Sequence, residues 1–347
     1  MDRFRAQGGR VAAVTPIHHH RALLRAHGVL PVEVWGPPRT DTSLGDAHLQ
    51  AYTCSIVRAA LSFFLDGGID AVDLMVMPHG CDSLQGLTSV VQKFVKPDKP
   101  VLPLYLPRGT RACDVAFLAA ELRAMHDALQ EITGAAVDEA TLLDAVQREE
   151  AADARTRHLL TDHLPRTRDV QGLYRLIRTR EYLPAEDYLS LTEGRPPETG
   201  AGAGIPLILS GIVPEPMDIL TAISDAGGRV VADDTACCGR RAYAGGTGTD
   251  PFQRMAEAIV HGPPDPMRGS LIGARNEHLG RLAEATGARG VLFYVVKYCE
   301  PELYDIPLIV KGMRERGLQT LVLETEIGMP LDDRTVGRIE AFMEMLA

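Results

Sequence analysis

The 347-residue chain has no long hydrophobic run. No stretch of about 18 consecutive apolar residues occurs, and the first residues, MDRFRAQGGRVAAV, lack the apolar centre of a secretory signal. We therefore expect neither a membrane span nor a signal peptide, and we expect the protein to reside in the cytoplasm.

The sequence also lacks an excess of basic residues. It carries 36 Lys and Arg against 46 Asp and Glu, which gives a net charge of −10. A general nucleic-acid-binding protein shows a basic face, so this balance argues against that class. A local basic pocket for a small acidic ligand stays possible.

Cysteine is scarce, and its spacing excludes several common sites. Six cysteines in a chain of this length are too few for a disulfide scaffold. No C-x-x-C pair is present, so the spacings of zinc ribbons, thioredoxins and ferredoxins are all missing. Any metal site must be assembled from segments that lie far apart in the sequence.

The composition, 45% hydrophobic and 24% charged, is typical of a globular protein. Strand-like and helix-like patterns alternate in the first part of the chain, which favours an α/β fold with a parallel sheet and helices on both faces. The predicted strands are 10–14, 29–35, 69–76 and 101–107, and the predicted helices are 21–28, 48–65 and 84–94. We assign residues 1–112 to a first α/β lobe.

The alternation of strand and helix patterns stops after this lobe. Residues 113–191 have helical periodicity and are rich in Ala, Leu, Glu and Arg, which predicts a helical insert. Residues 192–204 are rich in Gly and Pro and are predicted to be a linker. Alternation resumes in residues 205–347, the predicted second α/β lobe, with strands at 205–211, 229–234, 290–298 and 319–325 and a last helix at 333–346. Two similar lobes are expected to face each other across a cleft.

Most cysteines follow predicted strands. Five of the six do so: Cys81, Cys113, Cys237, Cys238 and Cys299. The sixth, Cys54, lies inside a helical pattern. The carboxyl ends of parallel strands form the ligand-binding edge of such sheets, and a thiol at a helix N-terminus is biased toward thiolate. Free cysteines are also common as small core residues, but chance burial does not explain this placement.

Thiolates at one edge favour a soft metal or an iron–sulfur cluster. Three cysteine ligands would leave one iron of a [4Fe–4S] cube open to a substrate oxygen, a water or a bridging sulfide.

Several sequence blocks carry a family resemblance. MPHGCDSLQGL, LYLPRGTR, LILSGIVPEPMDIL, VVADDTACCGRR, PPDPMRGS and FYVVKYCEPELYDIP occur in order. Together they resemble the 2-hydroxyacyl-CoA dehydratase and benzoyl-CoA reductase family, and most of all the small cluster-bearing subunit of ATP-dependent benzoyl-CoA reductases. The resemblance extends from PIHHHRALLRAHGVLPVEVWG to the end of the chain.

The resemblance implies two flavodoxin-like lobes around a [4Fe–4S] cluster with three cysteine ligands. Cys81 and Cys299 match the first and last ligands, and Cys113 falls at about the right distance after the first. It also implies an acyl-CoA substrate, a homologous sister subunit or a second copy as dimer partner, and a separate ATP-hydrolysing iron–sulfur activator that supplies single electrons. Neither nucleic acid nor membrane is expected as a partner.

Two alternatives stay open. Relatives with a double-cubane [8Fe–9S] cluster, which reduce small molecules without CoA, also use cysteines in segments like those of Cys54, Cys237 and Cys238. This chain reads GPPDPMRGS where some members have a further cysteine, so we prefer the single cube. The other alternative is a two-lobe ligand-binding protein without metal.

Three further motifs have two interpretations each. The HHH run at 18–20 suggests a metal tract by composition, but we interpret it as a solvent-exposed helix end. His79, beside Cys81, is either a catalytic or sulfur-contacting residue or a histidine of the core. Arg240 and Arg241 either bind a CoA phosphate or pair with Asp233 and Asp234.

Overall fold

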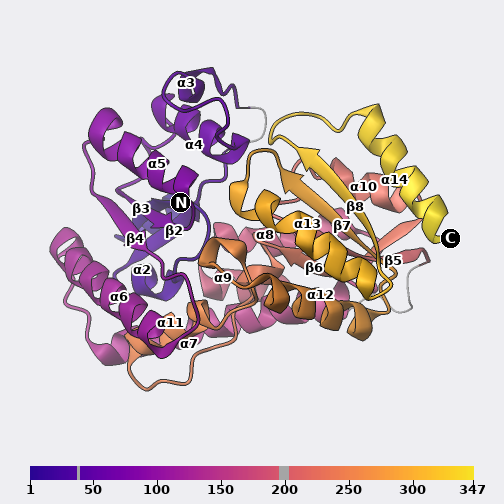
Figure 1. The fold of residues 1–347 in the computed structure, drawn as a ribbon. Helices are drawn as coiled ribbons and strands as arrows, with labels where there is room; N and C mark the ends of the chain where they lie inside the picture. The colour runs from indigo at the N-terminus through magenta and orange to yellow at the C-terminus, as the bar shows by residue number, and fades with distance from the viewer. Residues whose placement is uncertain (37–39, 195–202) are drawn as a thin grey trace.

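The computed structural model describes residues 1–36, 40–194 and 203–347. Two four-stranded parallel sheets lie side by side, each covered by helices (Figure 1), which confirms the predicted α/β fold with two lobes. The strands of the first sheet are β1 (Arg10–Val14), β2 (Val29–Glu33), β3 (Leu74–His79) and β4 (Val101–Tyr105). Those of the second are β5 (Ile205–Gly211), β6 (Gly228–Thr235), β7 (Gly290–Val296) and β8 (Gln319–Thr325).

Both sheets have the same topology. The spatial orders are β2-β1-β3-β4 and β6-β5-β7-β8. In each sheet the second strand lies on one side of the first strand, and the third and fourth strands lie on the other side. The order of the strands thus reverses at the first strand. This is the order with which a flavodoxin-like sheet begins, and its ligand site lies at the carboxyl end of the strands where the winding reverses. The two reversal points are therefore between β1 and β3 and between β5 and β7.

Continuous apolar runs build the sheets. β7 reads GVLFYVV and is buried along its whole length, as expected for a parallel strand covered on both faces. In the first sheet Ala12 pairs with Leu74 and Met75 pairs with Val101. The core is continuous between the lobes, because one buried cluster contains Met75 from β3 together with Leu209 from β5 and Leu292 from β7.

Several predicted bounds were wrong by about two residues, and two were wrong by more. β3 begins at Leu74 rather than at residue 69, because residues 66–71 form turns and the Asp73 carboxylate accepts a hydrogen bond from the backbone N–H of Val11 at 2.7 Å. The predicted helix 48–65 begins only at residue 55, as α4 (Ser55–Leu65), and a separate short helix, α3 (Ser43–Asp46), precedes it. Cys54 is therefore the N-cap of α4 and not an interior helical residue.

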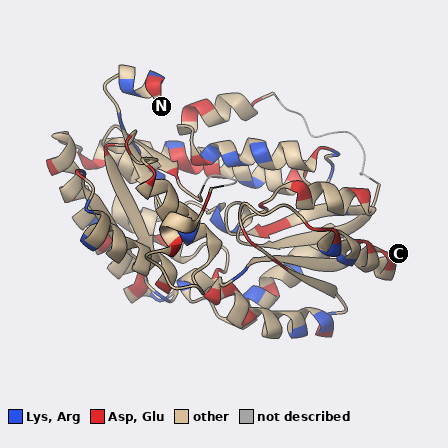
Figure 2. Ribbon diagram, turned by 90° about the horizontal axis from the view of Figure 1, so that it is seen from above, with Lys and Arg blue, Asp and Glu red and all other residues tan. Residues whose placement is uncertain are grey.

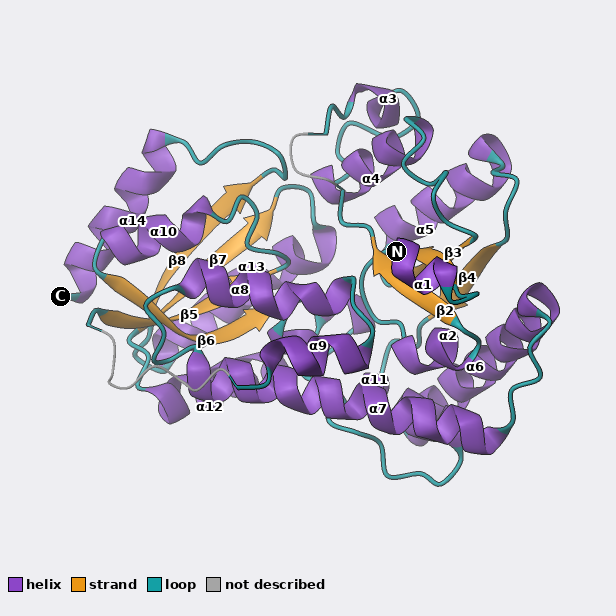
Figure 3. Ribbon diagram, turned by 180° about the vertical axis from the view of Figure 1, so that it is seen from behind, coloured by secondary structure: helices purple, strands orange, loops and turns teal. Residues whose placement is uncertain are grey.

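The remaining helices of the first lobe are α1 (Asp2–Ala6), α2 (Arg21–Ala26) and α5 (Asp82–Val90), which continues into a π-helical turn (Val91–Val95). Between the sheets come α6 (Ala112–Thr133), α7 (Glu139–His158), α8 (Val170–Arg178) and α9 (Ala185–Thr192). Gly134, with φ of +71°, ends α6, and Asp138 caps α7 by accepting from the backbone N–H of Thr141 at 2.8 Å. Helix α7 extends alongside both lobes (Figure 3). Of the predicted linker, residues 195–202 lie outside the described residues.

The second lobe adds α10 (Asp218–Asp225), α12 (Ile272–Thr286), α13 (Glu300–Glu315) and α14 (Asp333–Leu346). One helix of this part of the sequence, α11 (Pro251–Val260), packs instead against α6 and α7 beside the first lobe (Figure 1). Its Phe252 and Met255 share a buried cluster with Leu118 and Leu122 of α6. The chain thus returns to the first lobe after β6.

Charged residues of both signs occur on the same surface helices (Figure 2). Among the residues that the structure describes, no helix combines the length and apolar character needed to cross a membrane.

Candidate functional site

A small pocket lies where the two reversal points meet. Its walls come from the loops that follow four strands: Ile17 after β1, Cys81 after β3, Ile212 after β5 and Cys299 after β7. Cys54 completes the set of thiols. We call this space the thiol pocket, defined by Cys54, Cys81 and Cys299.

Each of these three thiols belongs to the N-cap of a helix. Cys54 caps α4, Cys81 caps α5 and Cys299 caps α13. The N-terminus of a helix carries a partial positive charge and unpaired backbone N–H groups, so it stabilises a negative group in front of it. Three such ends therefore point their thiols into one pocket, an arrangement suited to thiolates that share a cation.

In the absence of a cation the three thiols are neutral. Burial raises the pKa of Cys81 to about 12, and the nearby Cys54 adds to this rise. Burial, followed by Cys54 and Glu302, raises the pKa of Cys299 well above its ordinary value. The expected bias of Cys81 toward thiolate is thus outweighed by desolvation. A bound metal reverses this balance, because a coordinating thiol loses its proton to the metal.

The pocket fits an iron–sulfur cluster in its donor chemistry. It offers three soft sulfur donors in apolar surroundings that include Ile17 and Ile212. Within the described ranges, no three His, Cys, Asp or Glu side chains are already spaced to ligate a metal ion. The free space is about 20 Å³, so a cube would require the surrounding loops to move apart.

Cys113 and His79 lie elsewhere. Cys113 is exposed in the first turn of α6 and does not line the thiol pocket. His79 ends β3, and its ring packs edge-on against Tyr105 with centroids 4.7 Å apart. Both ring nitrogens of His79 are buried, and neither has a hydrogen-bond partner among the described residues. Burial lowers the pKa of His79.

Cys237 and Cys238 form a second thiol site. They follow β6, and their sulfurs lie 3.5 Å apart. They face a separate cavity of about 40 Å³, which is lined by charged side chains such as Glu149, Asp153 and Arg180. We call it the polar cavity, defined by Cys237, Cys238, Glu149, Asp153 and Arg180.

The histidine run 18–20 is buried, so its interpretation as a solvated helix end was wrong. His18 is 1% exposed and donates or accepts a 2.7 Å hydrogen bond with the Tyr243 hydroxyl. His19 and His20 line the polar cavity. Burial lowers the pKa of His19 to about 3 and that of His20 to about 4. After β6 the chain passes back to the first lobe, and residues 236–260 cover the three histidines.

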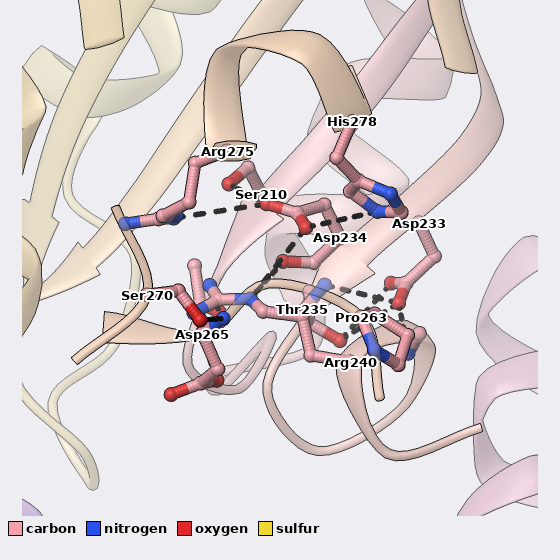
Figure 4. A network of polar contacts seen from close by, with 12 residues as sticks. Ser210, Asp233, Asp234, Thr235, Arg240, Pro263, Asp265, Ser270, Arg275 and His278 are labelled. Carbon is pink, nitrogen blue, oxygen red and sulfur yellow. Dashed lines mark hydrogen bonds and ion pairs between the residues drawn. The ribbon is translucent and has the colours of Figure 1, made fainter. Parts of the chain in front are cut away.

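Arg240 is fully buried at the centre of a polar network (Figure 4). It pairs with Asp234, Asp265 and Glu302, and Arg275 pairs with Glu302 at 3.2 Å. Glu302 lies in the first turn of α13, three residues after Cys299. The network therefore fixes the start of this helix against β6.

Arg241 belongs to a different group. Its guanidinium donates two hydrogen bonds to the carboxylate of Glu33 at the end of β2. Burial alone raises the pKa of Glu33, but Arg241, His19 and Arg21 together outweigh it, and the pKa falls to about 2. The Glu33 carboxylate also accepts a hydrogen bond from the indole N–H of Trp35 at 3.2 Å. Both arginines are thus held in buried ion pairs, and neither is available to a CoA phosphate.

A larger cavity of about 620 Å³ lies on the other side of Trp35. Its walls are mostly apolar and come from both lobes, among them Phe63, Met217 and Ile327. Trp35 lines this cavity and the thiol pocket as well. We call it the apolar cavity.

The sequence alone did not indicate the roles of Trp35 and Ile212, and it indicated Cys54 only in part. Trp35 lay in a predicted strand with no partner to suggest a wall, although its status as the only tryptophan was a signal. Ile212 is an ordinary apolar residue. Cys54 was predicted only as a second-choice ligand of a double-cubane cluster, because the wrong boundary of its helix concealed its N-cap position.

Comparison with known proteins gives a consistent result. The family model for the 2-hydroxyglutaryl-CoA dehydratase D-component matches residues 16–346. The chain is 25% identical to the lactoyl-CoA dehydratase subunit beta of Anaerotignum propionicum, over 100% of this chain and 94% of that protein. It is 22% identical to the (R)-2-hydroxyglutaryl-CoA dehydratase subunit beta of Acidaminococcus fermentans, with the same coverage. It is also 24% identical to a subunit of the benzoyl-CoA reductase of Thauera aromatica, over 88% of this chain and 83% of that protein.

Proposed function

Because the chain belongs to the 2-hydroxyglutaryl-CoA dehydratase D-component family, we propose that it is the iron–sulfur subunit of an acyl-CoA dehydratase or reductase. The relatives are named as subunits of such enzymes. The observation that supports the iron–sulfur part is the convergence of Cys54, Cys81 and Cys299, each at a helix N-terminus, on one pocket at the sheet reversal points.

Cys81 and Cys299 are proposed ligands on two grounds, their place in the pocket and the family resemblance. For the third ligand the two grounds differ. The geometry favours Cys54, which faces the same pocket, whereas the resemblance implies Cys113, which is exposed outside it. We propose Cys54.

A [4Fe–4S] cluster held by three thiolates supplies a low-potential one-electron donor and one open iron that acts as a Lewis acid. The residues of the chain exclude water from the site and keep the surroundings apolar. The three helix N-termini stabilise the negative charge of the thiolates. Arg240, through Glu302, keeps the segment that carries Cys299 in place.

The names of the relatives, which are subunits of acyl-CoA dehydratases or reductases, support a sister subunit and an acyl-CoA substrate, and the activator rests on the family resemblance alone. We propose a homologous sister subunit, and a separate ATP-hydrolysing activator that delivers single electrons. We also propose that the assembly works in the cytoplasm on an acyl-CoA thioester.

Iron and sulfide analysis after anaerobic purification tests the proposal. A single cube gives about four irons per chain, and its visible absorption bleaches when the activator and ATP deliver an electron. A chain with no iron or sulfide would contradict the proposed function. A chain with about eight irons would instead support the double-cubane alternative, in which further thiols such as Cys237 and Cys238 take part.

A further inference from the structure

Cys237 and Cys238 are adjacent in the sequence, and both line the polar cavity. Their sulfurs lie 3.5 Å apart, and the two residues are 6% and 1% exposed. A disulfide holds its sulfurs at about 2.0 Å, so a shift of roughly 1.5 Å would join this pair. The proposed cluster uses neither thiol, so the pair is available for a chemistry of its own.

The two thiols differ in how readily they lose a proton. Their hydrogen bond, followed by burial, raises the pKa of Cys238 well above its ordinary value, so Cys238 keeps its proton and donates it to the neighbouring sulfur. A thiolate at Cys237 is stabilised by this donor and by the charge of the Arg178 guanidinium. Because the thiolate is the nucleophile, Cys237 is the attacking thiol of the pair.

The walls of the polar cavity contain unused hydrogen-bonding groups. Nη1 of Arg180 is a buried donor without a hydrogen-bond partner among the described residues. His19 provides an acceptor: its Nδ1 donates to the Ile17 carbonyl at 2.9 Å, which leaves Nε2 as a buried lone pair that is also without a partner there. A guest that both donates and accepts hydrogen bonds would satisfy both groups.

The free space limits the size of this guest. It is about 40 Å³, whereas one water needs roughly 10–15 Å³ measured in the same way. The cavity therefore admits a molecule slightly larger than water. Asp153, whose side chain is 19% exposed, is where the lining reaches solvent, so a small molecule can enter there.

We propose that Cys237 and Cys238 are an oxidation site for hydrogen peroxide, which converts the two thiols into a vicinal disulfide. Peroxide has two oxygens, fits the free space and both donates and accepts hydrogen bonds. This inference goes beyond the proposed function and does not depend on the cluster.

The reaction has two steps. The sulfur of Cys237 attacks one peroxide oxygen, the O–O bond breaks, and the thiol proton leaves with the departing hydroxide as water. The sulfur of Cys238 then displaces the hydroxyl group of the sulfenic acid, which leaves with the second thiol proton as another water. The two thiols lose two electrons together, and the peroxide gains them.

The disulfide should be easy to reduce again. Adjacent Cα atoms are about 3.8 Å apart, whereas most disulfides join Cα atoms roughly 4.4–6.8 Å apart. A disulfide between neighbours is therefore strained, and strained disulfides have the more oxidising potentials that are typical of labile or regulatory bonds. The oxidation is thus a reversible modification.

The position of the pair connects its oxidation to the thiol pocket. Cys238 is the N-cap of the 3-10 turn Gly239–Arg241, so closing the sulfurs moves the start of this turn. Within the turn, Arg240 pairs with Glu302, which lies in the first turn of the helix that Cys299 caps. Oxidation in the polar cavity therefore acts on a contact that positions a thiol of the pocket.

The test is a titration of the anaerobically purified full chain with hydrogen peroxide, followed by denaturation, alkylation of free thiols, tryptic digestion and mass spectrometry. Peptide 230–240 contains Cys237 and Cys238 and no other cysteine. Most of it should lack alkyl groups and be lighter than the reduced peptide by two hydrogen atoms, and dithiothreitol should restore both thiols. The exposed Cys113, in peptide 112–123, is the reference thiol. A peptide 230–240 that keeps both alkyl groups at a dose that oxidises Cys113 completely would overturn the proposal.

Two serine variants test the order of the thiols. Cys238→Ser should stop at the sulfenic acid of Cys237, which dimedone labels, whereas Cys237→Ser should take up little dimedone because Cys238 keeps its proton. Equal labelling of the two variants would overturn Cys237 as the attacking thiol.

Iron analysis of the same samples separates this inference from the proposed function. A chain without iron that still forms the disulfide contradicts only the cluster. Loss of half of the iron from either serine variant would show that these sulfurs ligate a cluster, and would overturn the oxidation site.

Discussion

The two thiol sites of this protein are built in opposite ways. In the thiol pocket, three cysteines from distant segments stand at three helix N-termini among apolar side chains. In the polar cavity, two adjacent cysteines share their surroundings with Glu149 and Asp153, both of which are ion-paired with Arg180.

The difference indicates which site is prepared for a metal. The thiols of the thiol pocket take part in no ion pair among the described residues. A cation that binds them therefore displaces no strong interaction. The charges of the polar cavity already neutralise each other, and a metal there would have to displace buried ion pairs at a cost of several kcal/mol. Sulfur count alone does not distinguish the sites, whereas the neighbours of the sulfurs do.

The largest expected effect is the loss of the cluster from the thiol pocket. Cys81→Ser and Cys299→Ser should each lose most of the iron, sulfide and brown colour, because an alcohol is a poor ligand for this metal. Cys238→Ser, in the polar cavity, is the matched control and should keep both. Full iron and sulfide content in anaerobically purified Cys81→Ser would show that the ligand assignment is wrong.

A second pair of variants decides the third ligand. Cys54→Ser should lose most of the iron, because Cys54 faces the pocket, and Cys113→Ser should keep it, because Cys113 is exposed on α6. The measurement is again iron and sulfide per chain. The reverse result would assign the third ligand to Cys113, as the family resemblance implies, and would require α6 to approach the pocket.

The ion pairs around the polar cavity should matter for stability. Arg241→Gln leaves the buried Glu33 carboxylate without its main partner and should lower the free energy of unfolding by about 3–5 kcal/mol. Urea denaturation measures this. Arg148→Gln, which breaks the exposed helical pair with Asp144, should cost less than about 0.5 kcal/mol. If Arg241→Gln lowers the free energy of unfolding as little as Arg148→Gln does, the buried ion pair contributes little to stability.

The polar cavity should also make stability depend on pH. Burial lowers the pKa of His20 from 6.5 to about 4, so the folded chain binds its proton less readily than the unfolded chain. This contribution is complete above about pH 6.5 and is lost as the pH falls toward the folded pKa, about 2 kcal/mol between roughly pH 7 and pH 5. His20→Gln should have a flatter profile in urea denaturation. The exposed His48→Gln is the control, and a profile of His20→Gln as steep as the parent's would refute this account.

The smallest expected effect is on iron content in the Cys237→Ala, Cys238→Ala double variant. It should retain about four irons per chain, with a loss of stability of about 1–2 kcal/mol from packing. Iron that falls by half from a parent value near eight would move the protein to the double-cubane class.

Helices and strands were predictable where neighbouring residues in the sequence determine them, as apolar runs and helix caps do. The strands at 10–14, 205–211 and 319–325 and the helix at 333–346 have the predicted bounds. Apolar runs set the strands, and Asp332 caps the last helix by accepting from Thr335 N–H at 2.8 Å. The family was predictable from six short blocks, and the match over residues 16–346 confirms it.

The site was only partly predictable because its contacts are not local. The cysteines were found by type and by their position after strands, but their grouping depends on how the lobes pack. Residues 18–20 are polar and were expected at the surface. They are buried because residues from the second half of the chain, such as Tyr243, supply their partners.

Helix α11 has a consequence for how the chain folds during synthesis. Its residues Phe252 and Met255 complete the buried cluster that contains Leu118 of α6, although they follow it by more than a hundred residues. A nascent chain released up to β5 exposes this apolar face of α6, since chains emerge at roughly 5–20 residues per second from the N-terminus. We therefore expect the core of the first lobe to close only after residue 260 has left the ribosome, and we expect a fragment that ends before α11 to aggregate rather than fold as an independent domain.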